Sequence, residues 1–255
     1  MYLSLSVAVV IPAYNEARLL PITLKKIPGF VDGIIVVDDG SSDDTACLVH
    51  TSSDQRITLV SHSENLGVGR AIATGYEVAL SRPYDLIVVM GADDQMDPNE
   101  MPQLLEPIAS GRADYSKGNR LGHPDHKKRM PRIRRLGTYY LSHLTRIATG
   151  LSDIEDSQCG FTAISRETLA NLPLKSLFPR YGYPNDLLSM LAVRKYRVVN
   201  VVVTPIYGSE HSELQIHRVC LPLCGILIRA VMRRIRCLVR DQNRVMVGHR
   251  LDETN

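Results

Sequence analysis

Short runs of β-branched and aliphatic residues recur along the first half of this 255-residue chain. They span residues 5–11, 34–37, 56–60 and 86–90. Such short, mostly apolar runs are typical of strands that are covered on both faces, as in a parallel sheet. Between them, apolar residues recur with helical spacing over 16–27, 68–80 and 98–109. Strand alternating with helix predicts an α/β fold with a doubly wound, mostly parallel, Rossmann-like sheet.

The second half of the chain is less regular. We expect a basic loop over residues 117–135, helices over 133–148 and 185–195, and a strand over 197–203. We divide the chain into a domain over 1–208 and a C-terminal appendage over 209–255, which agrees with the usual size of one large domain. In open α/β sheets, ligands bind beyond the carboxyl ends of the strands, so the polar segments there hold the candidate functional residues.

Composition narrows the class of protein. With 44% hydrophobic residues, the chain has enough apolar material for a core, which excludes a disordered chain. Its 30 basic and 27 acidic side chains give a net charge of +3, yet residues 117–135 and 214–240 are strongly basic. Those stretches lack interleaved aromatic residues, so nucleic-acid binding finds little support. The five cysteines form no C-x-x-C pair, which favours a reduced, cytoplasmic setting.

Polar side chains follow the first two predicted strands. The first strand ends in Pro12, Tyr14 and Glu16, and the second ends in the pair Asp38 and Asp39. Carboxylates at neighbouring strand ends accept hydrogen bonds from a base or a ribose hydroxyl, as in nucleotide sites of open sheets. Capping of the next helix is the competing interpretation for the residues that follow, Ser41 and Asp43.

A glycine-rich turn opens the helix over 68–80. Gly67 and Gly69 follow Asn65, and glycine lets the backbone approach a phosphate at the positive end of a helix. An ordinary turn has the same pattern. The turn follows the third strand and lacks the last glycine of the dinucleotide fingerprint, which counts against a nicotinamide-dependent dehydrogenase.

The fourth predicted strand runs into an acidic segment. Asp93, Asp94 and Asp97 lie within five residues together with the amide of Gln95. Hard oxygen ligands at the end of a buried strand predict a site for Mg²⁺ or Mn²⁺. A solvated turn before Pro98 is the alternative.

The C-terminal segment has the pattern of an amphipathic helix. Four arginines share one helix face, namely Arg229, Arg233, Arg236 and Arg240. The opposite arc is apolar and comprises Ile228, Val231, Met232, Ile235, Leu238 and Val239. A cationic stripe backed by an apolar arc is typical of a helix at a membrane interface. A helix that packs on the domain with its charges in water also fits the pattern.

Two features that the sequence lacks bear on how the protein would relate to a membrane. No window reaches the roughly 20 apolar residues that span a bilayer, and the N-terminus lacks the charged region of a signal peptide. We therefore expect a cytoplasmic protein attached peripherally to the cytoplasmic face of the membrane through the four arginines.

Six ordered motifs carry a family resemblance. They are VVIPAYNE, VVDDGSSDDT, ENLGVGRAIATGYEVAL, ADDQMDP, DSQCGF and GYPNDLL. Together they resemble family 2 glycosyltransferases, and most closely the branch of dolichyl-phosphate mannose synthase and bacterial polyprenyl-phosphate glycosyltransferases. The resemblance covers roughly residues 5–208 and implies a GT-A fold.

The resemblance also implies roles for individual positions. The residues implied for the donor nucleotide are Pro12, Tyr14, Glu16, Asp38, Asp39, Asn65 and Gly67. Asp93 and Gln95 correspond to ligands of a divalent metal, and Arg120 and Arg134 to residues that meet phosphate groups. Asp156, Gln158 and Asp186 fall on the acceptor side, and Asp93 and Asp186 are the implied catalytic residues.

The chain departs from the family pattern at one position. Gly91 stands where the family usually has the first aspartate of D-x-D, which leaves Asp94 or Asp97 as substitutes. The Q-x-x-R-W motif of processive synthases is also missing, since Val219 follows Arg218. The resemblance therefore does not imply polymer synthesis.

The expected function is metal-dependent, inverting transfer of a sugar from a nucleotide diphosphate to a polyprenyl phosphate. A metal ion neutralises the leaving diphosphate, and a phosphate acceptor is already an anion that needs no strong base. The basic cluster around Arg120 and Arg134 favours such an acceptor, although a solvated basic loop remains an alternative. Two other hypotheses stay open: transfer to a glycolipid or polysaccharide hydroxyl, with Asp186 as base, and a noncatalytic sugar-nucleotide-binding scaffold.

Overall fold

The computed structural model describes residues 1–207 and 216–252, and the strands of this part of the chain form one seven-stranded sheet. The strands are β1 (Val7–Ala13), β2 (Gly33–Asp38), β3 (Ile57–Ser61), β4 (Leu86–Val89), β5 (Tyr115–Asn119), β6 (Thr162–Ser165) and β7 (Val198–Val202). Their order is β3-β2-β1-β4-β6-β5-β7. All pairs are parallel except those of β6, which runs antiparallel to both β4 and β5.

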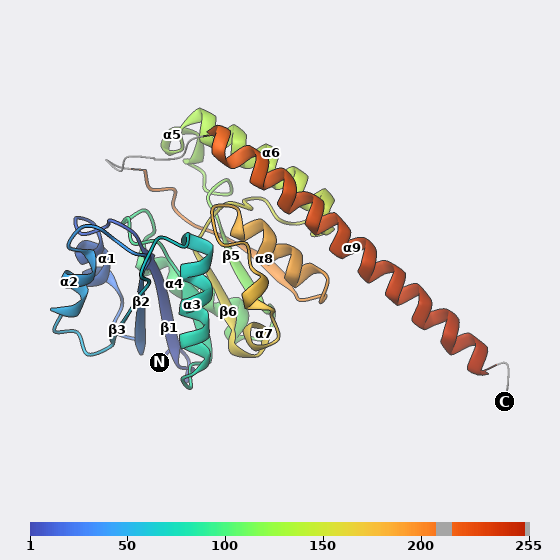
Figure 1. Ribbon diagram of the computed structural model, residues 1–255, viewed down its shortest axis with the longest axis horizontal. Helices are drawn as coiled ribbons and strands as arrows, with labels where there is room; N and C mark the ends of the chain where they lie inside the picture. Colours follow the sequence, from blue (N-terminus) through green and yellow to red (C-terminus); the bar gives the residue numbers. More distant parts are fainter. Residues whose placement is uncertain (208–215, 253–255) are drawn as a thin grey trace.

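Helices cover both faces of the sheet (Figure 1). They are α1 (Leu20–Lys26), α2 (Thr45–His50), α3 (Val68–Leu80), α4 (Met101–Ala109), α5 (His126–Arg129), α6 (Arg132–Thr149), α7 (Arg166–Ala170), α8 (Tyr183–Ala192) and α9 (Ile216–Asp252). Short 3₁₀ turns, η1 (Pro98–Glu100) and η2 (Leu174–Ser176), precede α4 and α8.

The central strands are buried because each side chain meets one of two apolar layers. On one face, side chains of β1 such as Val9 pack with Leu104 of α4, and on the other Val10 packs with Ile72 of α3. This explains why the strands lack polar alternation. The α/β class and the mostly parallel sheet expected from the sequence are thus confirmed.

The direction of the strands brings seven segments to one edge of the sheet. The segments after β1, β2, β3 and β4 leave it there, as do those after β5 and β7, which run the same way. Because β6 runs in reverse, the segment that precedes it meets this edge as well. Carboxyl ends of parallel strands are where open sheets bind ligands, so this edge holds the candidate site.

The second half of the sheet departs from the sequence-based expectation. β5 and β6 were not expected, and the basic loop predicted to begin at Lys117 begins inside β5. Lys117 is fully buried on that strand, and its ammonium donates to the carbonyl oxygen of Cys159. A strand that contains lysine, glycine and asparagine lacks the β-branched composition by which strands are recognised.

α9 lies alongside α6 and α8, and its far end extends beyond the rest of the molecule (Figure 1). It runs to Asp252 and includes most of the expected appendage over 209–255. The proposed domain boundary between 208 and 209 lies outside the described residues and remains a prediction. None of the helices in 1–207 and 216–252 combines the length and apolarity that crossing a bilayer requires.

Candidate active site

The segments after β1 and β2 hold each other in place. The backbone N–H of Asn15 donates to the Ser41 hydroxyl at 2.9 Å, and the side-chain oxygen of Asn15 accepts from the Ser42 N–H at 2.8 Å. The N–H of Glu16 donates to Thr45 at 2.8 Å. Pro12 lies on β1 opposite Val37, and Tyr14 directly follows the strand with its side chain exposed. Five predicted donor residues, Pro12, Tyr14, Glu16, Asp38 and Asp39, therefore come from one interlocked pair of strand ends.

Asp38 and Asp39 are both buried and have different partners. Asp38 accepts from the N–H of Ser41 at 3.1 Å. Asp39 accepts from the N–H of Gly67 at 2.8 Å and from His62 Nδ1 at 2.7 Å. Asp39 thus holds the turn between β3 and α3, a role that the sequence did not indicate. The capping alternative applies to Asp43, which accepts from the N–H of Thr45 at 3.0 Å.

The turn that carries Asn65 and Gly67 is pressed against a distant loop. Gly67 has φ of 98°, and a Cβ there would lie 2.6 Å from the carbonyl oxygen of Pro179. The N–H of Arg70 donates to that same oxygen at 2.9 Å. Glycine is required here by a left-handed conformation and by close approach of another backbone.

The predicted metal residues lie on the loop after β4. The N–H of Gln95 donates to Asp93 Oδ1 at 3.2 Å, which turns the loop back on itself. A Cβ at Gly91 would lie 2.7 Å from that Oδ1, so the carboxylate of Asp93 folds over the space that a side chain at position 91 would need. The absence of the first D-x-D aspartate thus leaves room for the Asp93 carboxylate in this orientation.

Asp94 and Asp97, the expected substitutes for that aspartate, have other partners. Asp94 forms an ion pair with Lys26 of α1 at 2.6 Å. Asp97 accepts from the N–H of Asn99 at 3.0 Å and so caps η1. Neither arrangement supports a role in holding a metal.

Glu16 is the second carboxylate beside Asp93. Its pKa is raised to about 7, first by burial and then by the negative charges of Asp93 and Asp43. Within the described part of the chain, no group of three His, Cys, Asp or Glu side chains is placed to hold a metal. Mg²⁺ is usually held by one or two carboxylates and completed by substrate phosphates and water. The donor set of Asp93 and Gln95, with Glu16 nearby, fits such an ion.

The acceptor side contains a buried ion pair. The guanidinium of Arg120, directly after β5, donates from Nε to Asp156 Oδ2 at 2.8 Å and from Nη2 to Oδ1 at 3.1 Å. Burial alone would raise the pKa of Asp156, but the charge and hydrogen bonds of Arg120 lower it. Burial also lowers the pKa of Lys117 to about 8, and the nearby charge of Arg120 acts in the same direction. Asp156 therefore serves to orient Arg120.

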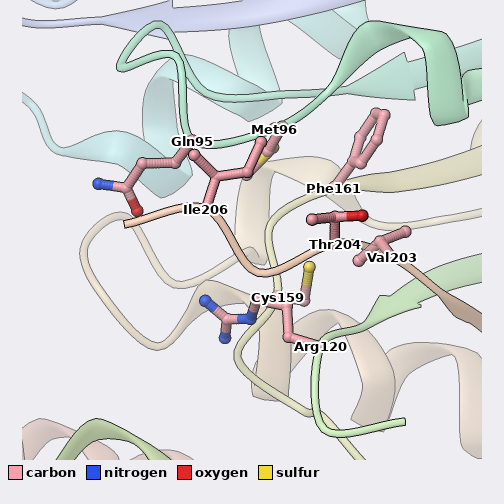
Figure 2. A pocket seen from close by; sticks show the side chains of 8 residues that line it. All are labelled: Gln95, Met96, Arg120, Cys159, Phe161, Val203, Thr204 and Ile206. Atoms are coloured by element: carbon pink, nitrogen blue, oxygen red, sulfur yellow. The ribbon is translucent and has the colours of Figure 1, made fainter. Parts of the chain in front are cut away.

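Arg120 and Arg134 meet at Tyr207. The hydroxyl of Tyr207 accepts from Arg120 at 3.2 Å, and the guanidinium carbon of Arg134 lies 5.3 Å from the centre of its ring. Beside them is a small cavity of about 20 Å³, into which Gln95 projects from the metal loop. Figure 2 shows the 203–206 segment crossing between Gln95 and Arg120. The two predicted phosphate-binding arginines and the predicted metal loop are thus neighbours.

Gln158 lies in the segment before β6, next to Asp156. Its amide donates to Asn185 Oδ1 on α8 at 2.6 Å. Asn185 Nδ2 is the one fully buried side-chain nitrogen or oxygen among the described residues that has no hydrogen-bond partner. A buried amide without a partner is rare in folded proteins, and a buried water molecule is one way to satisfy it.

Asp186, the predicted catalytic residue of the acceptor side, is fully buried. Its carboxylate accepts from the N–H of Phe178 at 2.9 Å and from two arginines of α9. Arg229 Nε lies 3.0 Å and Arg233 Nη1 2.6 Å from Oδ1. A carboxylate enclosed in this way does not reach an acceptor as a base, so the expected catalytic role finds no support in the structure.

The same contacts correct the expected orientation of α9. Arg229 and Arg233 turn toward the domain instead of a membrane surface, whereas Arg236 and Arg240 are exposed. The opposite, apolar arc faces outward: Ile228 is 62% exposed and Ile235 54%. Helical periodicity identifies an arginine face and an apolar face. It cannot decide which of them packs on the domain, because that depends here on the buried carboxylate of Asp186.

Two residues of the site were missed in the sequence. Tyr207 belongs to no motif, and only its position after a predicted strand that ends at the ligand-binding edge could have indicated it. His62 could have been suspected because it directly follows a strand end, but its partner Asp39 is 23 residues away.

Comparison with known proteins identifies the family. The model of the family described as "Glycosyl transferase family 2" matches residues 8–172. The chain is 30% identical over 203 residues to an undecaprenyl-phosphate mannosyltransferase of Micrococcus luteus, covering 78% of this chain and 82% of that protein. It is 28% identical over 218 residues to a UDP-N-acetylglucosamine–dolichyl-phosphate N-acetylglucosaminyltransferase of Methanococcus voltae, covering 80% of this chain and 86% of that protein.

A solved structure confirms the fold. Glucosyl-3-phosphoglycerate synthase of Mycobacterium tuberculosis, crystallised with Mn²⁺, UDP and phosphoglyceric acid, superposes with a TM-score of 0.71 at 22% identity. The match covers 89% of this chain and 79% of that chain. The family model spans well over half of the sequence, and the sheet is GT-A-like. This chain therefore belongs to glycosyl transferase family 2 and is a glycosyltransferase.

Proposed function

We propose that this enzyme transfers a sugar, with inversion, from a nucleotide diphosphate to a polyprenyl phosphate at a membrane surface. The observation that carries the proposal is the convergence of Arg120 and Arg134 on Tyr207 beside the loop of Asp93 and Gln95. Two guanidinium groups next to a predicted metal loop suit two phosphate groups, one of the donor and one of the acceptor.

The donor would bind across the ends of β1 to β4. Tyr14, Glu16 and Asp38 flank the expected place of the nucleoside, and the turn of Asn65 and Gly67, which Asp39 holds, would border it. Asp93 and Gln95 would hold Mg²⁺ or Mn²⁺, which when bound neutralises the charge of the leaving diphosphate. The Mn²⁺ and UDP bound by the mycobacterial synthase are consistent with this arrangement.

The acceptor proposal rests on charge and on the enclosure of Asp186. A phosphate acceptor needs cations around it, and Arg120 is held in one orientation by the fully buried Asp156. A sugar hydroxyl acceptor would need a base, and Asp186 is enclosed by Arg229, Arg233 and the Phe178 N–H. The names of the relatives from Micrococcus luteus and Methanococcus voltae also point to polyprenyl and dolichyl phosphates.

Exposed apolar side chains on two neighbouring helices support membrane attachment. On α9 they form the outward arc described above, and on α6 they are Ile133, Leu136, Tyr139, Tyr140, Leu144 and Ile147. Residues 126–149 and 216–240 contain no acidic side chain. Successive residues of a helix are rotated by about 100° around its axis, which places Arg234 and Arg236 on either side of the apolar arc of α9. Such a basic, apolar surface suits an anionic lipid interface, and of the four predicted arginine contacts Arg236 borders it.

The direct test is radiolabelled transfer from UDP-sugars and GDP-sugars to undecaprenyl or dolichyl phosphate with Mn²⁺ or Mg²⁺. We expect a lipid-linked product that disappears when the metal is chelated. Arg134→Gln should raise the acceptor KM about tenfold, because one charge-assisted phosphate contact is lost. The matched control is Arg135→Gln. It removes the same charge from the next residue, whose guanidinium donates to the Lys127 carbonyl and not toward Tyr207.

Two outcomes would overturn the proposal. Transfer to a glycolipid or polysaccharide hydroxyl, with none to a lipid phosphate, would favour the hydroxyl-acceptor alternative. Nucleotide binding that ignores Mn²⁺ and Asp93→Ala, with no transfer from any donor, would favour a noncatalytic scaffold.

A further inference from the structure

Asp186 lies where three separate segments meet. It is in the first turn of α8, and its carboxylate has no exposed surface. Two of its hydrogen-bond donors, Arg229 and Arg233, come from α9 more than 40 residues along the chain. A third is the backbone N–H of Phe178 in the loop before α8. One carboxylate therefore joins α8, α9 and this loop.

The two arginines also bind other atoms of the same surface. Arg229 donates to the carbonyl oxygen of Ser176 at 3.0 Å, and Arg233 donates to the hydroxyl of Ser189 at 2.6 Å. Ile226 of α9 packs so closely on Gly182 that a Cβ there would lie 2.7 Å from it. This side of α9 thus fits residues 176–189 through charge, hydrogen bonds and packing.

The loop that Asp186 holds contacts the turn over residues 64–70, which we call the donor turn. The Pro179 carbonyl accepts from the N–H of Arg70 at 2.9 Å. Gly67 and Gly69 lie against the backbone of residues 178–180, where a side chain would collide with it. From the other side, Asp39 holds the N–H of Gly67. The turn at Gly67 is therefore fixed between two buried carboxylates, directly by Asp39 and indirectly by Asp186.

A second set of contacts connects the first turn of α8 to the acceptor side. Asn185 precedes Asp186 in the first turn of α8, and its side-chain oxygen accepts from Gln158 at 2.6 Å. Gln158 is next to Cys159 and Asp156, and Asp156 orients Arg120. The position of the N-terminal turn of α8 thus bears on both halves of the site.

From these contacts we propose that Asp186 is a positioning residue that couples the docking of α9 to the shape of the donor turn over residues 64–70. Loss of the two guanidinium groups leaves Asp186 with only the Phe178 N–H of these three donors, and an uncompensated buried charge is strongly unfavourable. This favours release of α9, and with it the segment over residues 176–182 loses the hydrogen bond from Arg229 to Ser176 and the contact of Ile226 with Gly182, so that it can open and release Arg70. That the turn binds the donor rests on the proposed function, whereas the coupling itself does not.

Hydrogen exchange in the full-length protein, without any ligand, tests the coupling. In Arg229→Gln/Arg233→Gln we expect amides of residues 64–70 and 177–183 to exchange about tenfold faster than in the wild type, because local opening becomes easier. Arg236→Gln is the matched control: it removes the same charge from an exposed position of the same helix, and exchange in both segments should stay unchanged.

A milder variant covers the case in which the double substitution prevents folding. Arg229→Lys/Arg233→Lys keeps both charges but loses the forked geometry of the guanidinium, so an intermediate exchange rate is expected. The proposal is overturned if exchange rises in α8 and α9 while residues 64–70 exchange as in the wild type.

Nucleotide binding supplies the link to function. Calorimetry with UDP and with GDP, each with Mn²⁺, should show about tenfold weaker binding to the double glutamine variant and unchanged binding to Arg236→Gln. Equal affinity of wild type and double variant would refute the effect on the donor site. If neither nucleotide binds the wild type, the proposed function fails, and the exchange experiment still decides the coupling.

Discussion

The proposed donor and acceptor sides of the site, called the two halves below, are built in different ways. On the donor side, consecutive strands β1 to β4 end side by side, and the loops that follow them contact one another. On the acceptor side, each key side chain is fixed by a residue far away: Arg120 by Asp156 and Tyr207, and Asp186 by Arg229 and Arg233. The donor side is thus organised by the sheet itself, and the acceptor side by buried ion pairs that join separate segments.

Electrostatics differs between the halves in the same way. Glu16 and Asp93 on the donor side repel one another, and this contributes to the raised pKa of Glu16. On the acceptor side, cations and carboxylates neutralise one another beneath the surface. A bound cation would stabilise the two carboxylates of the proposed donor side, whereas the carboxylates Asp156 and Asp186 already have arginine partners.

The largest expected effect concerns the buried pair of the acceptor side. Arg120→Met leaves the fully buried Asp156 without its main partner and should lower the free energy of unfolding by about 3 kcal/mol. Arg112→Met breaks the exposed pair with Glu106 and should cost less than about 1 kcal/mol. Urea unfolding of both variants measures this. If both variants lost the same free energy of unfolding, the acceptor half would not depend on the buried Arg120–Asp156 pair.

On the donor side, the corresponding change should affect activity more than stability. Asp93→Asn removes the charge expected to hold the metal and should lower kcat by about 10²- to 10³-fold, as for other lost electrostatic stabilisers. Asp97→Asn, a few residues away, alters only the cap of η1 and should leave kcat near that of the wild type. Transfer assays over a range of Mn²⁺ concentrations compare the two. A normal kcat for Asp93→Asn would refute the assignment of the metal loop.

The helices beyond the acceptor side allow a test of the membrane surface. Tyr140→Asp/Ile235→Asp places two carboxylates in the exposed apolar surface and should reduce partition into anionic vesicles at least about tenfold. Leu48→Asp is the control, since Leu48 is a similarly exposed apolar residue of α2, at the other end of the molecule (Figure 1). Vesicle sedimentation distinguishes them. Loss of binding in both variants would mean that the surface is not specific.

The smallest expected effect is the pH dependence due to Glu16. A carboxyl whose pKa is raised to about 7 in the folded protein stabilises it when protonated, and this contribution is lost as the pH rises from about 4.5 through 7. In metal-free protein, Glu16→Gln should therefore be about 1 kcal/mol more stable than the wild type above pH 7. The two should agree near pH 4. Thermal unfolding across this range would contradict the account if the difference stayed constant.

The strand ends and the helix of the proposed donor side were predicted well because their signals are local. The helix over 68–80 has the bounds of α3, and the strand ends before Glu16, Asp39 and Asp93 were recognised from continuous apolar runs. The acceptor side was predicted less well. Lys117 concealed a strand, because its burial depends on Cys159, 42 residues away.

The long-range ion pairs could not be predicted from the sequence, because their partners are also far apart along the chain. Asp186 was assigned to the acceptor from its motif, but its environment is set by Arg229, 43 residues later. The arginine stripe of α9 was identified correctly as a helix face, yet the pattern is identical whether that face meets lipid or protein. Only the fold reveals the carboxylate that it covers.

Because β6 runs in reverse, the two proposed sides of the site are reached by the chain in different ways. The loops of the proposed donor side leave the sheet, whereas the segment carrying Asp156 and Gln158 enters it before β6 and lies outside the βα units of β1 to β4. We expect a substitution or insertion before Asp156 to change the proposed acceptor side and to leave the register of β1 to β4 intact. The antiparallel strand thus separates, along the chain, the residues that would choose an acceptor from those that would hold a nucleotide.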